Sequence, residues 1–203
     1  MINPIDLLKK LQKNKIDFFT GVPDSVLKSF IELIPRKHHY MAQNEGSAIS
    51  LAAGFHLSTK KIGLVYLQNS GLGNSINPLT SIAHKEVYSI PLLLLIGWRG
   101  SPNSKDEPQH LVKGKITIEL LKLMKIKYII LDNKNHLNKI NGLINYAKKN
   151  NCPVALLIKN NFLEKIQLKN HSRNNKYPSR SFIITNILKN LEKKTKLVVS
   201  TGY

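Results

Sequence analysis

The sequence has few of the residues that build several common kinds of site. Cys152 is the only cysteine among 203 residues, which excludes a disulfide within the chain and any zinc site that needs several thiolates. The histidines are scattered without metal-ligand spacing. No apolar run approaches the roughly 20 residues that span a bilayer, and the N-terminal segment lacks the pattern of a signal peptide. We therefore expect a cytoplasmic protein that has no membrane partner.

Acidic residues are also scarce, because 12 Asp and Glu stand against 31 Lys and Arg, giving a formal net charge of +19. Such a charge raises nucleic acid as a partner. The lysines, however, are spread in pairs along expected helices and loops, without a nucleic-acid-binding motif or interleaved aromatic residues. We therefore interpret the charge as a solvated basic surface and expect no nucleic-acid partner. Tight, salt-sensitive binding of DNA or RNA would contradict this interpretation.

Short apolar runs alternate with segments that have helical spacing. Continuous apolar runs of this length are typical of strands that are buried on both faces of a sheet. Between them, segments such as 26–34 and 116–124 place apolar residues three or four positions apart. The alternation predicts an α/β fold, in which a parallel sheet of about six strands carries helices on both faces. The expected strands are 16–19, 38–42, 62–67, 91–96, 127–131 and 153–158.

The pattern ends near residue 160, so we expect residues 1–160 to form one domain. Residues 161–180 are polar and basic without sustained periodicity, which is typical of a linker. Residues 181–203 predict a helix, capped by Ser179 or Ser181, and then a strand over 196–203. One helix and one strand cannot make a core. They are either the truncated start of a second α/β domain or an addition to the edge of the first sheet.

The loops that follow the strands are the candidate ligand sites, because parallel sheets bind ligands at the carboxyl ends of their strands. Glu45, in "YMAQNEGSAISLAAG", lies where a strand is expected to turn into a helix. With Asn44 as N-cap, the helix dipole would favour this carboxylate by up to about 1 kcal/mol, which is a purely structural role. Alternatively, the small residues around it let a ring or another subunit approach. Desolvation would then raise the pKa of Glu45 and make it a proton carrier.

Three further loops carry polar residues with open interpretations. In "YLQNSGLGNSINPL", Gly71 and Gly73 leave backbone N–H groups accessible, either in a simple tight turn or in a ligand contact. In "FTGVPDSVLKSF", Asp24 or Ser25 could cap the next helix. The loop "IGWRGSPNSKDEPQH" follows the most apolar strand, and Arg99 in it could hold an anionic group through two hydrogen bonds.

Five blocks of the sequence together resemble the pyrimidine-binding domain of thiamine-diphosphate-dependent 3-phosphonopyruvate decarboxylases. Sulfopyruvate decarboxylase subunits are similar to it as well. The resemblance covers about residues 1–160, and the segment from Ser179 to Tyr203 resembles the start of the diphosphate-binding domain of the same enzymes. The blocks are "FFTGVPDS", "NEGSAISLAAGFHL", "VYLQNSGLGNSINPL", "IGWRG" and "DEPQH".

The resemblance implies thiamine diphosphate as cofactor and a 2-keto acid with a phosphonate or sulfonate group as substrate. It implies that the catalytic residue Glu45 hydrogen-bonds N1′ of the aminopyrimidine, so that this ring can remove the thiazolium C2 proton. Loss of CO2 then leaves an aldehyde. The implied cofactor-binding residues are Pro23, Glu45, Asn69, Ser70, Gly71 and Gly73, and the implied substrate-binding residues are Asp24, Ser25, Arg99 and His110.

The chain departs from the family in one respect. The family binds its metal ion through a Gly-Asp-Gly block followed by paired asparagines, which this sequence does not contain. We therefore expect no metal ligands here, Mg²⁺ on a missing diphosphate-binding domain, and a homo- or hetero-oligomer in which a partner supplies that domain. The chain alone is expected to be inactive. The blocks "GWRG" and "DEPQH" favour phosphonopyruvate. The alternatives are the alpha subunit of a sulfopyruvate decarboxylase and a non-catalytic, truncated domain.

Overall fold

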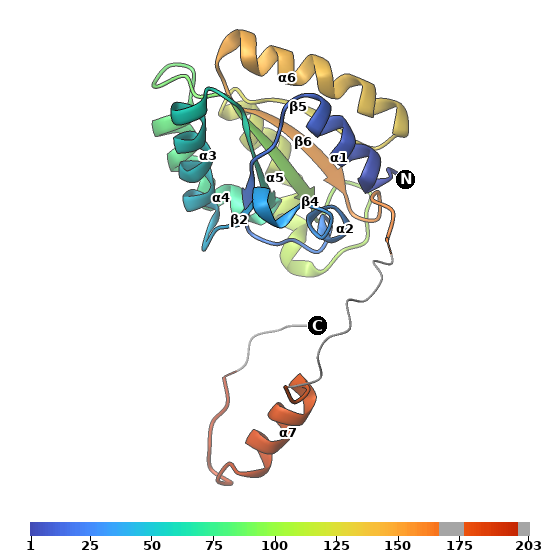
Figure 1. Cartoon of the computed structure of the whole chain (residues 1–203). Helices are drawn as coiled ribbons and strands as arrows, with labels where there is room; N and C mark the ends of the chain where they lie inside the picture. Colours follow the sequence, from blue (N-terminus) through green and yellow to red (C-terminus); the bar gives the residue numbers. More distant parts are fainter. Residues whose placement is uncertain (167–176, 199–203) are drawn as a thin grey trace. The chain divides into compact units, whose positions relative to one another are not determined.

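The computed structural model describes residues 1–166 and 177–198 (Figure 1). The chain divides into two compact units, residues 1–166 and 167–203. The first unit is built on a six-stranded sheet with the order β2-β1-β3-β4-β6-β5, in which every pair of neighbours is parallel. This confirms the predicted α/β fold. The strands are β1 (Phe19–Gly21), β2 (His39–Met41), β3 (Gly63–Gln68), β4 (Leu92–Trp98), β5 (Lys127–Ile130) and β6 (Val154–Lys159).

Helices cover both faces of this sheet, as predicted. Helices α1, α2 and α6 pack on one face, and α3, α4 and α5 pack on the other. Their bounds are α1 (Pro4–Lys13), α2 (Lys28–Ile31), α3 (Glu45–Thr59), α4 (Leu72–Pro78), α5 (Pro108–Leu123) and α6 (Lys139–Asn150). Short turns of 3₁₀-helix at 36–38, 69–71 and 134–138 and of π-helix at 79–83 lie between them.

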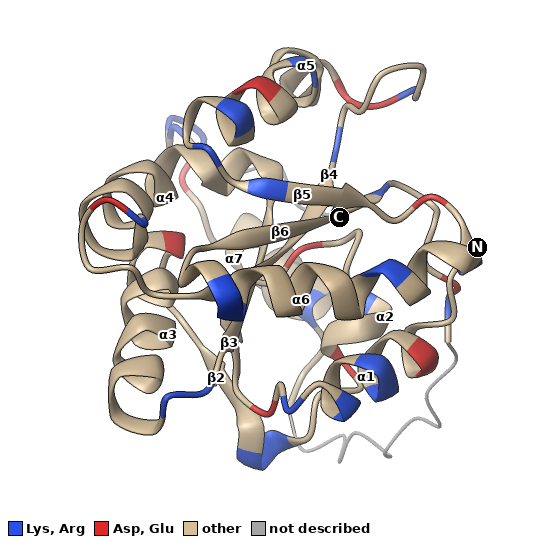
Figure 2. Ribbon diagram, turned by 90° about the horizontal axis from the view of Figure 1, so that it is seen from above, with Lys and Arg blue, Asp and Glu red and all other residues tan. Residues whose placement is uncertain are grey.

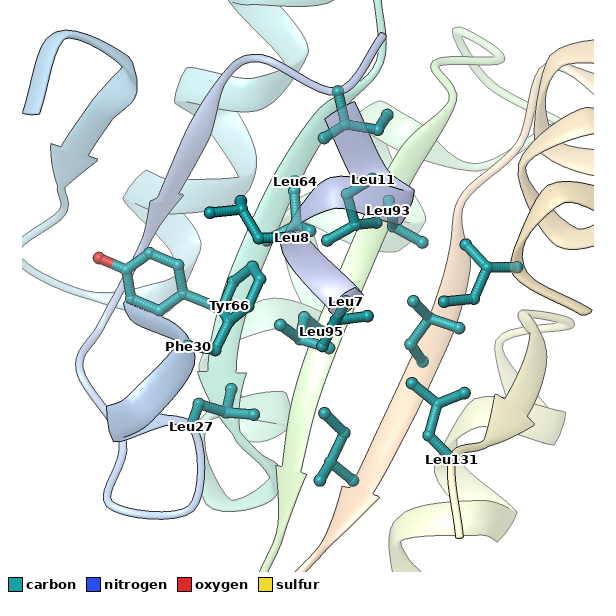
Figure 3. Close-up of a cluster of buried hydrophobic side chains, with 14 of the residues drawn as sticks. Leu7, Leu8, Leu11, Leu27, Phe30, Leu64, Tyr66, Leu93, Leu95 and Leu131 are labelled. Carbon is teal, nitrogen blue, oxygen red and sulfur yellow. The ribbon is translucent and has the colours of Figure 1, made fainter. Parts of the chain in front are cut away.

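Each central strand contributes to two hydrophobic cores, because successive side chains of a strand point to opposite faces. On β3, Leu64 and Tyr66 enter the core beneath α1, α2 and α6, whereas Val65 and Leu67 enter the other core. Figure 3 shows the first core, with Leu93 on β4 beside Leu64. Burial on both faces explains why these strands are continuous apolar runs.

Two sequence-based element assignments were wrong in extent. The first strand begins at Phe19, not at residue 16, because Ile16 still donates its N–H to Leu11 O (3.1 Å) at the end of α1. The helix expected over 26–34 is reduced to α2. Before it, residues 26–27 form a turn in which Asp24 Oδ2 accepts the N–H groups of Val26 and Leu27.

The first unit extends beyond the expected boundary at residue 160. Ile2 forms a parallel bridge with Leu163, and its N–H donates to Phe162 O (2.7 Å). Asn3 also donates to the Glu164 carboxylate at 3.1 Å. These contacts hold the start of the predicted linker against the N-terminus.

The second unit contains α7 (Arg180–Lys189), which begins after Ser179, one of the two expected caps. The Ser179 hydroxyl accepts the N–H of Phe182 at 3.2 Å. No strand forms over the part of 196–203 that the structure describes, 196–198, since residues 177–198 contain no strand to pair with it. Residues 199–203 lie outside the described residues.

Basic side chains are distributed over the fold. Figure 2 shows Lys and Arg on α1, α5 and α6 and on the connecting loops. Among the residues that the structure describes, no helix combines the length and the apolar character that a bilayer crossing requires.

Candidate functional site

The loops that carry the expected site residues lie at one edge of the sheet. They follow β1, β2, β3 and β4, which are neighbours in the order β2-β1-β3-β4. Because all four strands are parallel, their carboxyl ends meet at the same edge. The topology therefore brings together loops that are far apart in the sequence, such as those of Ser25 and Arg99, 74 residues apart, as the strand-loop pattern predicted.

Glu45 is the first residue of α3. The side chain of Asn44 accepts the N–H of Ser47 (2.8 Å), as expected of the N-cap. The half-buried Glu45 carboxyl lies against Gly71, where a Cβ atom would be 2.3 Å from Oε1 and 2.5 Å from Cδ. Asn74 donates to Oε2 at 2.9 Å. The carboxyl is thus fixed between the start of α3 and the start of α4. It packs against Gly71, which has no side chain that would displace it.

A hollow of about 1100 Å³ lies between α3 and α4, and its lining includes neighbours of Glu45 but not Glu45 itself. Gly46 and Asn74, the neighbours of Glu45, form part of its wall. Stacked aromatic rings form another part, with Phe18 at 4.4 Å from Phe55 and 5.0 Å from Tyr40, measured between ring centroids. The hollow is large enough for an aromatic ring or for side chains of a second chain.

Asp24, which follows β1, is a buried carboxyl with only 6% of its surface exposed. Oδ2 accepts the N–H groups of Val26 (3.1 Å) and Leu27 (3.2 Å), and it lies where a Cβ of Gly97 would be. Among the described residues Oδ1 has no hydrogen-bond partner. Burial raises the pKa of Asp24 to about 6, although these hydrogen bonds and the nearby Arg99 oppose the rise. This carboxyl therefore titrates close to neutral pH.

The raised pKa predicts how stability depends on pH. Between the ordinary pKa of 3.8 and the folded value of about 6, the folded protein binds a proton that the unfolded chain has lost. The free energy of unfolding therefore falls as pH rises through this window, by about 3 kcal/mol from this group. Asp24→Asn keeps an oxygen for the backbone N–H groups and removes the titration. In urea denaturation from pH 4 to 8, the free energy of unfolding of the variant should increase relative to that of the wild type as pH rises. A difference in unfolding free energy that stays constant with pH would contradict the raised pKa of Asp24.

Arg99, at the end of β4, makes its forked contact within the chain. Its Nε donates to both carboxylate oxygens of Asp106 at 2.9 Å, and Nη2 donates to Oδ1 of the same carboxylate. Nη1 donates to the Ser25 hydroxyl at 3.2 Å. His110 lies in the first turn of α5, where burial and the charge of Arg99 lower the pKa of its imidazole. At neutral pH this ring is uncharged.

Asn69 connects the loops after β3 and β4. Its buried side chain accepts the N–H of Arg99 (3.1 Å) and donates to Arg99 O (3.0 Å) and to the Thr117 hydroxyl (2.9 Å). The Ser70 hydroxyl accepts from Gln68 at 2.7 Å. The expected cofactor role of Asn69 stays a prediction, since its side chain is engaged inside the fold.

The site residues fall into two groups joined by residues 69–71. Glu45 and Gly71 make the first group. The second contains Asp24, Ser25, Arg99 and His110. Of the remaining expected residues, Gly73 faces open space, and exposed Pro23 lines a smaller hollow of about 330 Å³ together with Asp24 and Ser25.

Comparison with protein families is consistent with this arrangement. Residues 6–125 match the family described as the N-terminal TPP binding domain of thiamine pyrophosphate enzymes. The chain belongs to this family. The expected resemblance is thereby confirmed at the level of the TPP-binding domain.

Curated relatives of this TPP-binding domain are decarboxylases by name. Phosphonopyruvate decarboxylase of Streptomyces viridochromogenes is 38% identical over 134 residues, which are 64% of this chain and 33% of the relative. The sulfopyruvate decarboxylase subunit alpha of Methanocaldococcus jannaschii is 31% identical over 161 residues, 77% of this chain and 93% of the relative. The chain thus spans about a third of the phosphonopyruvate decarboxylases that it matches.

Solved structures show the same fold. Benzoylformate decarboxylase from Polynucleobacter necessarius superposes with a TM-score of 0.61 at 21% identity, over 82% of this chain and 31% of the other. The thiamine diphosphate-dependent 4-hydroxybenzoylformate decarboxylase of Rhodococcus jostii gives 0.58 at 18% identity, over 92% and 36%. The predicted fold type of the pyrimidine-binding domain is confirmed.

The sequence analysis assigned no role to three residues of this TPP-binding domain that hold the site together. Asn74 holds Glu45, Thr117 holds Asn69, and Asp106 holds Arg99. Asp106 carried the clearest signal, because it is an acid within the "DEPQH" block, seven residues after the arginine. The other two pairs join separate helices, which the sequence alone does not place side by side.

Proposed function

We propose that this chain supplies the pyrimidine-binding half of a thiamine-diphosphate-dependent decarboxylase of phosphonopyruvate or sulfopyruvate. Of the two acids we propose 3-phosphonopyruvate, which would give phosphonoacetaldehyde and CO2. The observation that carries the proposal is the Glu45 carboxyl, held by Asn74 against the bare backbone of Gly71 at the start of α4. The family match and the names of the relatives support it.

The residues around Glu45 fit the aminopyrimidine of the cofactor. A Cβ at residue 71 would displace the carboxyl, so Gly71 keeps Glu45 where it is. When bound, thiamine diphosphate supplies an electron sink for the loss of CO2. Glu45 holds the proton at the ring nitrogen, and Asn74 fixes the direction in which the carboxyl points. A second domain or subunit over the hollow would exclude water and strengthen this hydrogen bond.

Ser25, Arg99 and His110 would bind the substrate. Nη1 of Arg99, which does not contact Asp106, donates to the Ser25 hydroxyl and would donate to an anionic group of the substrate beside it. Neutral His110 offers one further ring N–H to the same region. Asp24 lies behind Ser25 and can lose or keep its proton near neutral pH.

A partner that carries the diphosphate-binding domain completes the proposal. Among the described residues no three His, Cys, Asp or Glu gather into a possible metal site. The Mg²⁺ prediction therefore remains an expectation for the partner domain. Relatives that are named as alpha subunits support a hetero-oligomer.

Purification of the complex through a tag on this chain tests the proposal. We expect CO2 release from phosphonopyruvate that depends on added thiamine diphosphate. Turnover of sulfopyruvate only would overturn the choice of substrate, and the extent of the match to the M. jannaschii alpha subunit makes this the second candidate. Failure of the complex to bind thiamine diphosphate would instead favour a non-catalytic domain.

A further inference from the structure

We infer that Asp106 is a positioning residue for substrate binding, because it orients the guanidinium of Arg99 toward Ser25. The inference rests on the proposed function, in which Arg99 binds the anionic group of the substrate. It concerns a residue that itself need not touch the substrate.

The contacts of Asp106 fix the guanidinium from one side. A guanidinium carries five N–H donors, and Asp106 takes those of Nε and the adjacent Nη2. The edge formed by Nη1 and Nη2 stays available, and Nη1 lies 3.2 Å from the Ser25 hydroxyl. Without Asp106, rotation about the side-chain bonds of Arg99 would let this edge of the guanidinium adopt many orientations. The carboxylate therefore removes conformational freedom before a substrate binds.

Asp106 is held in place from its own side. Its carboxylate accepts the N–H of Gly100 (2.7 Å) and of Glu107 (2.9 Å), and its side chain is only 1% exposed. Gly100 has φ +63°, and a Cβ there would lie 2.0 Å from the carbonyl oxygen of His110. This glycine lets the loop fold back onto α5, which places the carboxylate beside Arg99.

The backbone of Arg99 is fixed as well. Asn69 forms hydrogen bonds with both its N–H and its carbonyl oxygen. The loop after β3 thus holds the backbone of Arg99, and the loop after β4 holds its guanidinium. Together they fix the position of the Nη1–Nη2 edge. The ion pair of Lys122 with Glu119 on α5 differs, because both side chains are exposed and they contact each other along one helix.

The charge of the pair affects which interaction binds the anion. The Arg99 hydrogen bonds lower the pKa of Asp106, so this carboxylate remains ionised, and the pair carries no net charge at neutral pH. A phosphonate or sulfonate would therefore be bound by directed N–H and O–H donors more than by net positive charge. Such a site depends on correct orientation, which is the property that Asp106 provides.

Asp106→Asn in the purified complex is the direct test. Asn keeps an acceptor for the N–H of Gly100 or Glu107 but loses the charged fork to Arg99. For the acid that the wild type decarboxylates, we expect KM to rise about tenfold or more. We expect kcat and the Kd of thiamine diphosphate to change less than about threefold. Asp106→Glu should recover part of the KM, and Glu119→Gln is the matched control on an exposed ion pair.

A second measurement does not depend on activity. In the ¹H–¹⁵N spectrum of the 203-residue chain, the Arg99 Nε–H should exchange slowly with solvent, and Asp106→Asn should remove this protection. The signal can be assigned with Arg99→Lys, because the only other arginines are Arg36, Arg173 and Arg180. If neither acid is decarboxylated but protection behaves as expected, the proposed function fails and the positioning stands.

Two results would overturn the inference. One is an unchanged KM in Asp106→Asn, whether or not the Arg99 Nε–H stays protected. The other is a parallel loss of thermal stability and cofactor affinity, which would show that Asp106 only holds the loop together.

Discussion

If the proposed decarboxylase function holds, replacing Glu45 by Gln is expected to lower the kcat of the complex by about 10²- to 10⁴-fold. The amide has the shape of the carboxyl, and its oxygen can still accept the hydrogen bond from Asn74. It cannot exchange a proton with the ring nitrogen of the cofactor. The variant should therefore fold and assemble, losing at most about 1 kcal/mol from the helix dipole. Steady-state kinetics of CO2 release measures the loss, and thermal unfolding checks the fold.

Glu86→Gln is the matched control for this experiment. Glu86 is an exposed glutamate that pairs with Lys125 at 2.9 Å, and the two residues precede β4 and β5, at the edge of the sheet opposite to the four loops. Its kcat should equal that of the wild type. An active Glu45→Gln complex would refute the proton-transfer role of Glu45, whatever the fold. The purely structural interpretation, a carboxylate at a helix N-terminus, would then be sufficient.

The second large effect is expected from Gly71→Ala, which should lower kcat by about 10- to 100-fold. The added Cβ would lie 2.3 Å from Oε1 of Glu45, so the carboxyl must move. The backbone of Gly71 has φ −73° and ψ −9°, a conformation that alanine adopts without strain. The loss should therefore come from displacement of Glu45 and not from misfolding.

A crystal structure of Gly71→Ala should show the Glu45 side chain in a different rotamer. Gly142→Ala on α6 is the control, because no atom lies within 4 Å of the Cβ that it would add. This control should keep full activity, with stability equal to or slightly above the wild type. Full activity of Gly71→Ala with an unmoved Glu45 would contradict the contact described here.

The fold could largely be predicted from the sequence because strands buried on both faces are continuous apolar runs. Leu92–Trp98 is such a run, and it forms the centre of the sheet. Prediction failed before α2, where residues 26–27 form a turn around the Asp24 carboxyl and the helix begins only at Lys28. It also failed at the first strand, where apolar Ile16 belongs to the end of a helix. Periodicity contains no information on either event.

The edge of the sheet at which the candidate residues gather could be predicted, but the partners of their side chains could not. The loops after parallel strands had to meet at one edge, which placed Glu45 and Arg99 in the same region. Two pairings depend on distances between loops. The guanidinium of Arg99 binds the Asp106 carboxylate, and the side-chain amide of Asn69 binds the backbone of Arg99. A sequence gives residue types and spacing along the chain, whereas these pairings depend on spacing across the sheet.

The alternation of buried side chains along β3 and β4 also affects how this site can change during evolution. A one-residue insertion within either strand would turn every later side chain to the opposite face and shift the loop behind it by one step. Both cores and one half of the site would be disturbed together. Changes of length are therefore expected in the loops and not within β3 or β4.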